Sequence, residues 1–355
     1  TRLSARCLEL LGNASASPRQ WGAFIPGVPD VEHFPHRVLK KIQDRLARRL
    51  RPEFLTYDAA GGVNELKEAL ADYLRTARGV RCSPEQILIT EGIHQALDLV
   101  TRTLCNPGDH AWIEEPGYWG IKNILRINAV NFSAIPVDEQ GMVPPDAGET
   151  PPKLIFVTPS HQYPLGSVMS LSRRRQLIFR ARETRSWIVE DDYDSEFRMN
   201  GHPIPPILSI DACEKVIYIN TFSKSLTSTI RISYMVLPGG LMAAFQQKLG
   251  FYSCTVPSFE QYTLARFIGR GFFEKHINRM RKFYKNRRNA VVSLLENCGF
   301  SDRLTIQEQD AGLHFLLNVA TSLSDQALTD KLAALGIREV GGPSGLRKTR
   351  FSSNS

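Results

Sequence analysis

Short runs of apolar and β-branched residues alternate along this chain with longer segments in which apolar residues recur at helical spacing. The runs cover residues 86–90, 110–114, 130–136, 153–157, 187–191, 216–220 and 232–237. Because most of them are continuously apolar, they predict strands of a mostly parallel sheet that helices cover on both faces. The predicted fold class is therefore α/β, with ligands expected at the carboxyl ends of the strands.

The two ends of the chain have a different pattern from its middle. Residues 1–55 contain two turns rich in proline and glycine and one basic helix, which predicts an arm packed on the body or on a neighbouring subunit. After Phe259 a long basic helical segment leads to a predicted strand at 312–317. We therefore expect an N-terminal arm (1–55), a large domain (56–255) and a smaller α+β domain (256–355).

Composition limits the class of protein. The chain has 355 residues, of which 42% are hydrophobic and 23% charged, as in ordinary globular proteins. Its six cysteines form no CxxC pair, which favours reduced thiols over a disulfide framework or a metal site. No apolar run has the length of a membrane helix, and the N-terminus lacks the apolar stretch of a signal peptide. These features predict a soluble, cytoplasmic protein.

The net charge of +8 is concentrated in three basic segments, at 45–51, 173–175 and 279–288. Such segments are usually solvated helix faces. Alternatively, a basic surface raises non-specific affinity for DNA. The sequence contains no module that reads base edges, so specific DNA contacts would require another domain.

Candidate chemistry centres on Lys224, which follows the strand run VIYIN. An unpaired ammonium group is costly to bury, so a lysine at this position needs a reason. Desolvation lowers the pKa of an amine, and a neutral amine forms a Schiff base with a carbonyl cofactor. Arg231, shortly after it, is suited to a phosphate. Taken alone, Lys224 fits a surface lysine equally well, but the pair indicates pyridoxal phosphate (PLP).

Other strand ends supply residues that fit the PLP ring. Asp191, which ends the run WIVED, is the candidate carboxylate that keeps the pyridine nitrogen protonated. Tyr193 would hydrogen-bond the ring hydroxyl. The acidic stretch that contains both residues could instead bind a divalent metal ion. Tyr118, in EEPGYWG, is the candidate to stack on the ring, with Trp119 as its rival.

The phosphate is expected where the first strand run turns into the following helix. The candidate ligands are Gly92, Ile93, His94, Thr221, Ser223 and Arg231. Glycine permits close approach of the backbone, and free amides at a helix start bind phosphate. The hydroxyl groups and the arginine would complete the cup. A substrate carboxylate would need an arginine near the C-terminus, for which Arg347 and Arg350 are available.

Six stretches carry a resemblance to a known family. They are 26–35 (PGVPDVEHFP), 55–90, 114–120 (EEPGYWG), 157–166 (VTPSHQYPLG), 190–198 (EDDYDSEFR) and 220–238. With these, the chain resembles fold-type I PLP enzymes of the class I aminotransferase group. More narrowly, it resembles the aminotransferase-like effector domain of MocR-type transcriptional regulators in the GntR superfamily. TPSHQYP together with EDDYDSEF is typical of these regulators and of their nearest enzyme relatives.

The resemblance implies roles for the matching residues. Lys224 would form the Schiff base with PLP, Asp191 would bind the pyridine nitrogen and Tyr193 the phenolic oxygen. Tyr118 would stack on the ring. The phosphate would be bound by the Gly92 turn together with the hydroxyl groups and the arginine named above.

Two further implied roles involve the neighbouring subunit and the C-terminal domain. Tyr57 would contact the phosphate of the neighbouring subunit, which implies a homodimer with sites at its interface. Arg350 best fits the arginine that binds the carboxylate of a substrate or effector.

Some residues depart from the family pattern. The usual Pro-Gly before the arginine is replaced at 227–230, Ser233 stands where glycine is usual, and Glu91 lies beside the expected phosphate. PLP binding is still expected. The family usually continues with a closing helix after Arg350. The winged-helix DNA-binding domain of the regulators would precede this chain, which begins about where the linker ends.

These features leave three functions open. We favour a regulatory effector domain that binds PLP and responds to an amine, an amino acid or PLP itself. The dimer would pass the resulting change to DNA-binding domains. The second is a working aminotransferase, in which the freed Lys224 amine moves the α-proton between an amino acid and a 2-oxo acid. The third is an interaction module that has kept the fold and lost the cofactor. Because regulator and enzyme share one site, the residues do not separate them.

Overall fold

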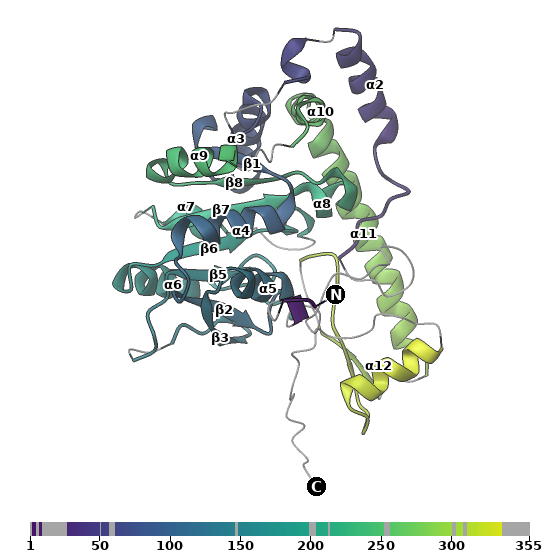
Figure 1. Cartoon of the computed structure of the whole chain (residues 1–355). Coiled ribbons are helices and arrows are strands. Elements are labelled where there is room, and N and C mark those ends of the chain that lie inside the picture. The colour runs from purple at the N-terminus through teal and green to yellow at the C-terminus, as the bar shows by residue number, and fades with distance from the viewer. Residues whose placement is uncertain are drawn as a thin grey trace.

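A sheet of eight strands forms the centre of the computed structural model (Figure 1). The strands are β1 (Ile87–Thr90), β2 (His110–Glu115), β3 (Asn131–Asp138), β4 (Gly141–Met142), β5 (Leu154–Val157), β6 (Trp187–Asp191), β7 (Val216–Thr221) and β8 (Ser233–Val236). Their order is β1-β8-β7-β6-β5-β2-β3-β4. The five strands from β7 to β3 pair in parallel, whereas β8 is antiparallel to both β7 and β1. The predicted mostly parallel sheet is confirmed.

The structure describes residues 2–4, 7–8, 27–49, 51–56, 61–145, 148–198, 204–211, 214–251, 256–299, 303–307 and 311–335. Its main helices are α2 (His36–Ala47), α3 (Asn64–Arg78), α4 (Gly92–Leu104), α5 (Trp119–Ile127), α6 (Leu171–Glu183), α7 (Ile207–Ile210), α8 (Phe222–Ser225), α9 (Met242–Phe251), α10 (Ser258–Gly269), α11 (Phe272–Glu296) and α12 (Asp325–Ala334). A second, two-stranded sheet pairs β9 (Leu304–Ile306) with β10 (Leu317–Val319). Of the helices in these ranges, none combines the length and apolarity needed to cross a bilayer.

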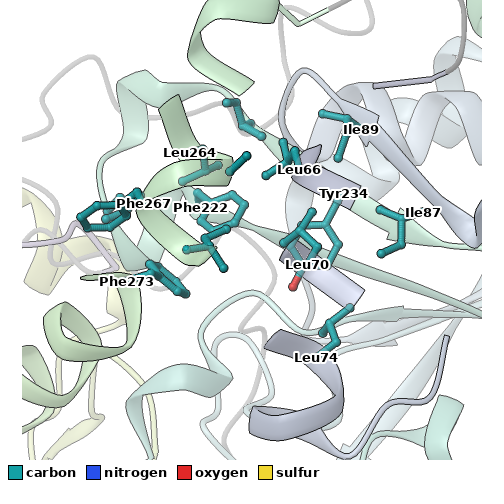
Figure 2. Packing of buried hydrophobic residues seen from close by; sticks show 14 of the residues in the cluster. Leu66, Leu70, Leu74, Ile87, Ile89, Phe222, Tyr234, Leu264, Phe267 and Phe273 are labelled. Carbon is teal, nitrogen blue, oxygen red and sulfur yellow. The ribbon is translucent and has the colours of Figure 1, made fainter. Parts of the chain in front are cut away.

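Alternate residues of each strand face different hydrophobic clusters, as the pleat of a strand requires. Leu88 and Met235 pack in the cluster that contains residues of α4, α5 and α9. Ile87 and Tyr234 point the other way and pack with residues of α2, α3, α10 and α11 (Figure 2). Both faces of the sheet are therefore buried, which explains why the strand runs are continuously apolar instead of alternating.

Helix α3 carries a polar residue into this core. Its buried positions Leu66, Leu70 and Leu74 recur every four residues, which gives the helix one apolar face. The helix ends at Gly79, whose φ of +66° is the left-handed conformation in which glycine is favoured. This ending leaves Arg78, the last residue of the helix, buried beside the sheet.

The strand predicted at 312–317 is wrong for most of its length, because β10 begins only at Leu317. Gly312 has a φ of +83°, and its N–H donates to the carbonyl oxygen of Phe197 at 3.1 Å. His314 bonds the carbonyl oxygen of Pro164. The backbone and side chains of this segment thus contact loops beside the central sheet, where the local sequence alone indicated strand pairing.

The basic helix expected near the N-terminus is α2, and the long basic segment after Phe259 forms α10 and α11. Figure 1 shows α11 running along the side of the molecule toward which the parallel strands end. The division into an arm, a large domain and a small domain stays a prediction.

Candidate cofactor site at the carboxyl ends of the strands

Lys224 lies in the short helix α8, directly after β7. The last residue of β7, Thr221, caps this helix, because its Oγ1 accepts the N–H of Ser223 at 3.2 Å. The Lys224 Nζ donates a hydrogen bond to the carbonyl oxygen of Gly27, 2.6 Å away. Burial lowers the pKa of Lys224, and nearby carboxylates oppose this effect. The fold therefore holds a partly buried amine at the edge of the sheet where ligands were expected.

Asp191 ends β6, the strand beside β7, and only 6% of its surface is exposed. Its Oδ1 has no hydrogen-bond partner among the described residues. Burial raises the pKa of its carboxyl group to about 8, and three acidic neighbours act in the same direction. These neighbours are Asp192, Asp194 and Glu114. A buried carboxylate oxygen without a donor is costly, so this position suits a ligand with a cationic N–H group. A protonated pyridine nitrogen is such a group.

The turn before α4 brings a guanidinium group against a glycine. Gly92 has a φ of +75°, and an added Cβ would lie 2.7 Å from Nη2 of Arg231. Arg231 lies just before β8, which separates β7 from β1 in the sheet. Its Nη2 also donates to the carbonyl oxygen of Glu91 at 3.3 Å. The fold thus places a fixed positive charge beside the N-terminus of a thirteen-residue helix, a combination that suits a phosphate.

The side chains of this turn have partners that the sequence did not predict. Glu91 is exposed, and its backbone N–H donates to Oε1 of Gln95 at 2.6 Å. The ring of His94 makes a 2.6 Å hydrogen bond with the hydroxyl of Tyr118. Burial lowers the pKa of His94, and the charge of Arg231 adds to the effect. The backbone amide of Glu91 is therefore already bonded within the protein. The next two candidate phosphate ligands, Ile93 and His94, lie in the first turn of α4.

Tyr118 precedes α5 at the end of β2. Its ring lies 5.9 Å from that of His94 in a stacked arrangement and 5.3 Å from that of Trp119. A Cβ at Gly120 would approach both the tyrosine ring (2.5 Å) and the imidazole (2.9 Å), so only glycine leaves room for this pair. Burial raises the pKa of the phenol. Tyr118 and Trp119 therefore lie together, and the contacts within the chain do not decide between them as the stacking residue.

Tyr193 contacts His161, which in turn contacts His314, and the sequence analysis gave neither histidine a role. The Tyr193 hydroxyl lies 3.1 Å from Nδ1 of His161, which in turn lies 2.9 Å from Oδ2 of Asp194. The ring of His314 lies 4.6 Å from the ring of His161. The motif TPSHQYP contains the first histidine and was the available signal. No signal marked the second one, because its segment was predicted as a strand.

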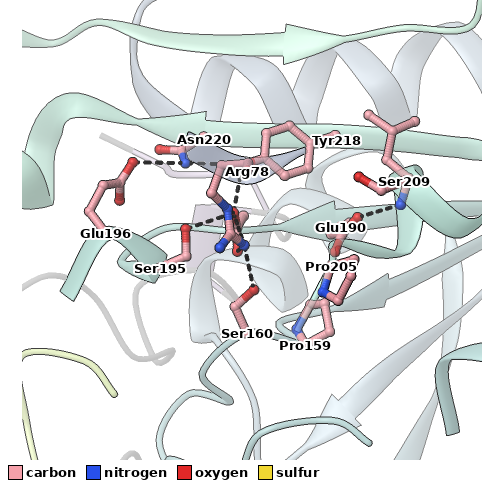
Figure 3. A network of polar contacts seen from close by, with 12 residues as sticks. Arg78, Pro159, Ser160, Glu190, Ser195, Glu196, Pro205, Ser209, Tyr218 and Asn220 are labelled. Carbon is pink, nitrogen blue, oxygen red and sulfur yellow. Dashed lines mark hydrogen bonds and ion pairs between the residues drawn. The ribbon is translucent and has the colours of Figure 1, made fainter. Parts of the chain in front are cut away.

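The acidic stretch 190–198 divides its carboxylates among different partners. Glu190 accepts N–H groups of Ile207 and Leu208 at 2.8 and 3.0 Å. Asp192 pairs with Arg78 at 2.8 Å. Figure 3 shows the Arg78 side chain of this pair among its polar neighbours. Although burial acts in the opposite direction, this guanidinium lowers the pKa of Asp192. Glu190 therefore caps a helix and Asp192 binds α3, so these two carboxylates have separate partners within the protein.

The ion pair between Arg78 and Asp192 belongs to a wider network of polar contacts beside the candidate cofactor site. Asp192 also accepts hydrogen bonds from the hydroxyls of Tyr218 (2.5 Å) and Ser195 (2.7 Å). Arg78 donates to Ser160 at 3.1 Å. The network ties α3 to β6, β7 and the loop after β5, and so fixes the strand ends that carry Asp191.

Tyr57, Arg347 and Arg350 lie outside the described residues. Their expected roles stay predictions. The other predicted residues lie at the ends of β1, β2, β6 and β7 or just before β8, whose start lies on the same side of the sheet because β8 is antiparallel to β7.

Comparisons with known proteins agree with this geometry. The family model for aminotransferase class I and II matches residues 27–347. The probable rhizopine catabolism regulatory protein MocR of Rhizobium meliloti is 38% identical over 306 residues, which cover 86% of this chain and 62% of that protein. The uncharacterized HTH-type transcriptional regulator YdeL of Bacillus subtilis is 37% identical over 320 residues, which cover 90% of this chain and 69% of that protein. The chain thus spans between three fifths and seven tenths of these two regulators.

Among solved structures, kynurenine aminotransferase of Pyrococcus horikoshii, crystallised with PMP, superimposes with a TM-score of 0.82 at 26% identity. The match covers 95% of this chain and 86% of the enzyme. The regulators are thus nearer in sequence, and the enzyme has the same architecture over almost the whole length. The chain belongs to the aminotransferase class I and II family, in the branch formed by the aminotransferase-like domains of MocR-type transcriptional regulators.

Proposed function

We propose that this chain binds PLP and serves as the effector-sensing part of a transcriptional regulator. The observation that carries the proposal is the pair formed by Lys224, in the short helix directly after β7, and Asp191, at the end of the adjacent strand β6. One is an amine whose pKa is lowered by burial, and the other is a buried carboxyl group with an oxygen that lacks a donor. Amine and carboxylate are the two groups that PLP needs at its aldehyde and at its ring nitrogen.

The residues present fit the cofactor. Asp191 would accept the pyridine N–H, and Arg231 with the first turn of α4 would bind the phosphate. Tyr118 would cover the ring, and Lys224 would be the covalent anchor. When bound, PLP supplies an aldehyde that reacts with amines and a ring that withdraws electrons.

The contact between Lys224 and Gly27 offers a route from the site to the N-terminal segment. A ligand that engages the Lys224 Nζ removes the hydrogen bond that this amine donates to the Gly27 carbonyl. The residues that follow contact α11, since the N–H of Asp30 donates to the Tyr284 hydroxyl at 2.9 Å. Occupancy of the site would thus change how residues 27–34 are held. A difference of this kind between two states is what a sensor requires.

The names of the relatives extend the proposal to partners. MocR is a regulatory protein and YdeL an HTH-type regulator. We infer that this part acts with a helix-turn-helix domain that contacts DNA, and that its effector is an amine or an amino acid. A homodimer would supply Tyr57 to the neighbouring site, and Arg350 would bind an effector carboxylate.

Turnover is the second candidate function, favoured by the close superposition on an aminotransferase. A Lys224 amine with a lowered pKa is also suited to act as a general base once it is released. Steady-state assays with amino acids and 2-oxo acids separate the two functions. Efficient transamination would contradict a purely sensory role.

The decisive experiment for PLP binding is an absorbance titration of the protein with PLP, followed by addition of candidate amines. We expect a visible band in the wild-type protein and its loss in Lys224→Ala. The matched control is Lys40→Ala, which removes an exposed lysine of α2 and should leave the band intact. A band that persists in Lys224→Ala would show that another residue anchors the cofactor, and its absence in the wild type would favour an interaction module without cofactor.

A further inference from the structure

Tyr193, His161 and Asp194 form a hydrogen-bonded chain whose purpose the proposed PLP site does not explain. The Nδ1 of His161 lies 2.9 Å from Oδ2 of Asp194 and 3.1 Å from the Tyr193 hydroxyl. The side chains of the histidine and the aspartate are 0% and 1% exposed. Since Tyr193 is the residue expected at the ring oxygen of PLP, the inference below rests on the proposed function.

The chemistry of these groups decides which of them donates. A carboxylate only accepts hydrogen bonds, so the Nδ1 of His161 that contacts Asp194 carries a proton. This holds for the neutral and for the charged imidazole. The same N–H lies within reach of the Tyr193 oxygen, which therefore accepts from it. The phenol then keeps its own O–H proton for a different partner.

The segment 311–314 fixes the orientation of the imidazole. Gly312 packs its backbone directly on the ring, and a Cβ added there would overlap Cε1 of His161. His314 covers the ring, with centroids 4.6 Å apart, and is itself anchored to the Pro164 carbonyl oxygen at 3.1 Å. His161 is thus held between Asp194 and a segment that lies far from it in the sequence.

We propose that His161, oriented by Asp194, is a positioning residue that directs the Tyr193 hydroxyl proton toward the ring oxygen of PLP. Burial and the neighbouring Asp194 raise the pKa of Tyr193, which keeps this proton on the phenol. If Asp194 could donate, Nδ1 would lose its proton, and Tyr193 would donate to His161 instead. The Asp194 carboxylate thus determines, through His161, in which direction the Tyr193 hydroxyl donates its proton.

The first test measures the imidazole directly, in protein that contains no PLP. Nitrogen-15 NMR of histidine-labelled protein distinguishes Nδ1–H from Nε2–H, and His161→Gln assigns the signal by its loss. We expect Nδ1 of His161 to be protonated in the wild type and to lose its proton in Asp194→Asn. The matched control is Asp30→Asn, which removes a similar carboxylate–imidazole contact at His33 (2.8 Å) and should leave His161 unchanged.

The second test uses the visible band of the protein with PLP. The pH midpoint of this band should shift by about one pH unit in Tyr193→Phe, the size expected for one lost hydrogen bond to a charged oxygen. Asp194→Asn should shift it in the same direction, and the double variant should shift no further than Tyr193→Phe alone. A merely structural role for Asp194 would add a second shift. Should Asp194→Asn fail to fold, His161→Phe removes the same donor and keeps a ring.

The two tests fail in different ways. A wild-type protein without a visible band contradicts the proposed function, while the NMR measurement still decides the protonation of His161. An Nε2–H tautomer in the wild type, or additive shifts in the double variant, overturns the inference.

His161, Asp194 and His314 also present ligand atoms within 4.8 Å of one another. An Nδ1 signal that changes on adding Zn²⁺ at stoichiometric concentration, and recovers with chelator, would equally overturn the inference.

Discussion

At the scale of single residues, the buried carboxyl group of Asp191 makes the protein without cofactor sensitive to pH. Burial raises its pKa from 3.8 to about 8 in the folded state. Between these values the folded protein holds a proton that the unfolded chain has lost, so the free energy of unfolding falls as the pH rises. We expect urea unfolding to show lower stability at pH 8 than at pH 5, and a weaker pH dependence in Asp191→Asn.

Glu114 acts in the same direction, since burial raises its pKa to about 7. Part of the pH dependence should therefore persist in Asp191→Asn. A variant with the full wild-type slope would show that Asp191 is not protonated in the folded protein.

Gly92 is a second position where one atom matters. An alanine there would combine an unfavourable φ of +75° with a clash against Arg231. We expect Gly92→Ala to lose about 1–2 kcal/mol of stability from backbone strain and, in addition, at least tenfold in affinity for PLP. Gly108→Ala is the matched control, because Gly108 has a φ of +89° and open space around it. Equal losses of PLP affinity in both variants would contradict a special role for the Gly92 turn.

At the scale of elements, the pair Arg78–Asp192 joins α3 to β6. Both side chains are buried, so removing one partner leaves an unpaired charge. We expect Arg78→Met to lower the unfolding free energy by about 3–5 kcal/mol in urea denaturation. Arg75→Met, one turn earlier in the same helix, breaks only an exposed pair with Asp72 and should cost less than about 1 kcal/mol. Similar costs for the two variants would mean that the buried network does not fix the helix to the sheet.

At the scale of the whole molecule, residues 27–34 lie between the candidate site and α11. Gly27 accepts a hydrogen bond from Lys224, and Arg279 of α11 donates to the His33 carbonyl oxygen at 2.8 Å. If PLP engages Lys224, the first of these bonds is lost. We therefore expect amide hydrogen exchange in 27–34 to become faster on adding PLP.

The same segment provides the control. In Lys224→Ala its exchange should be fast with and without PLP, because the bond to Gly27 is absent in both states. If adding PLP to the wild-type protein left the hydrogen exchange of residues 27–34 unchanged, PLP binding would not be coupled to this segment.

Much of the fold could be predicted from local pattern. The run 187–191 forms β6 with the same bounds, and the other runs form strands shifted by at most a few residues. The pattern succeeded because strands buried on both faces need uninterrupted apolar side chains. It was wrong at 312–317, where the residues are equally apolar but the backbone is held by Phe197 and the loop that contains Pro164.

The sequence by itself determined the α/β class and the family. It also predicted the strand-end residues Lys224, Asp191, Gly92 and Arg231, because chemistry at the ends of parallel strands follows from element order. Only the tertiary structure decided what surrounds these residues. It places the Gly27 carbonyl oxygen at Lys224 and the guanidinium group of Arg231 against Gly92. It also places His161 between Asp194 and Tyr193. These contacts join segments far apart in the chain. Local hydrophobic pattern carries no information about them, since they arise from how packed elements meet.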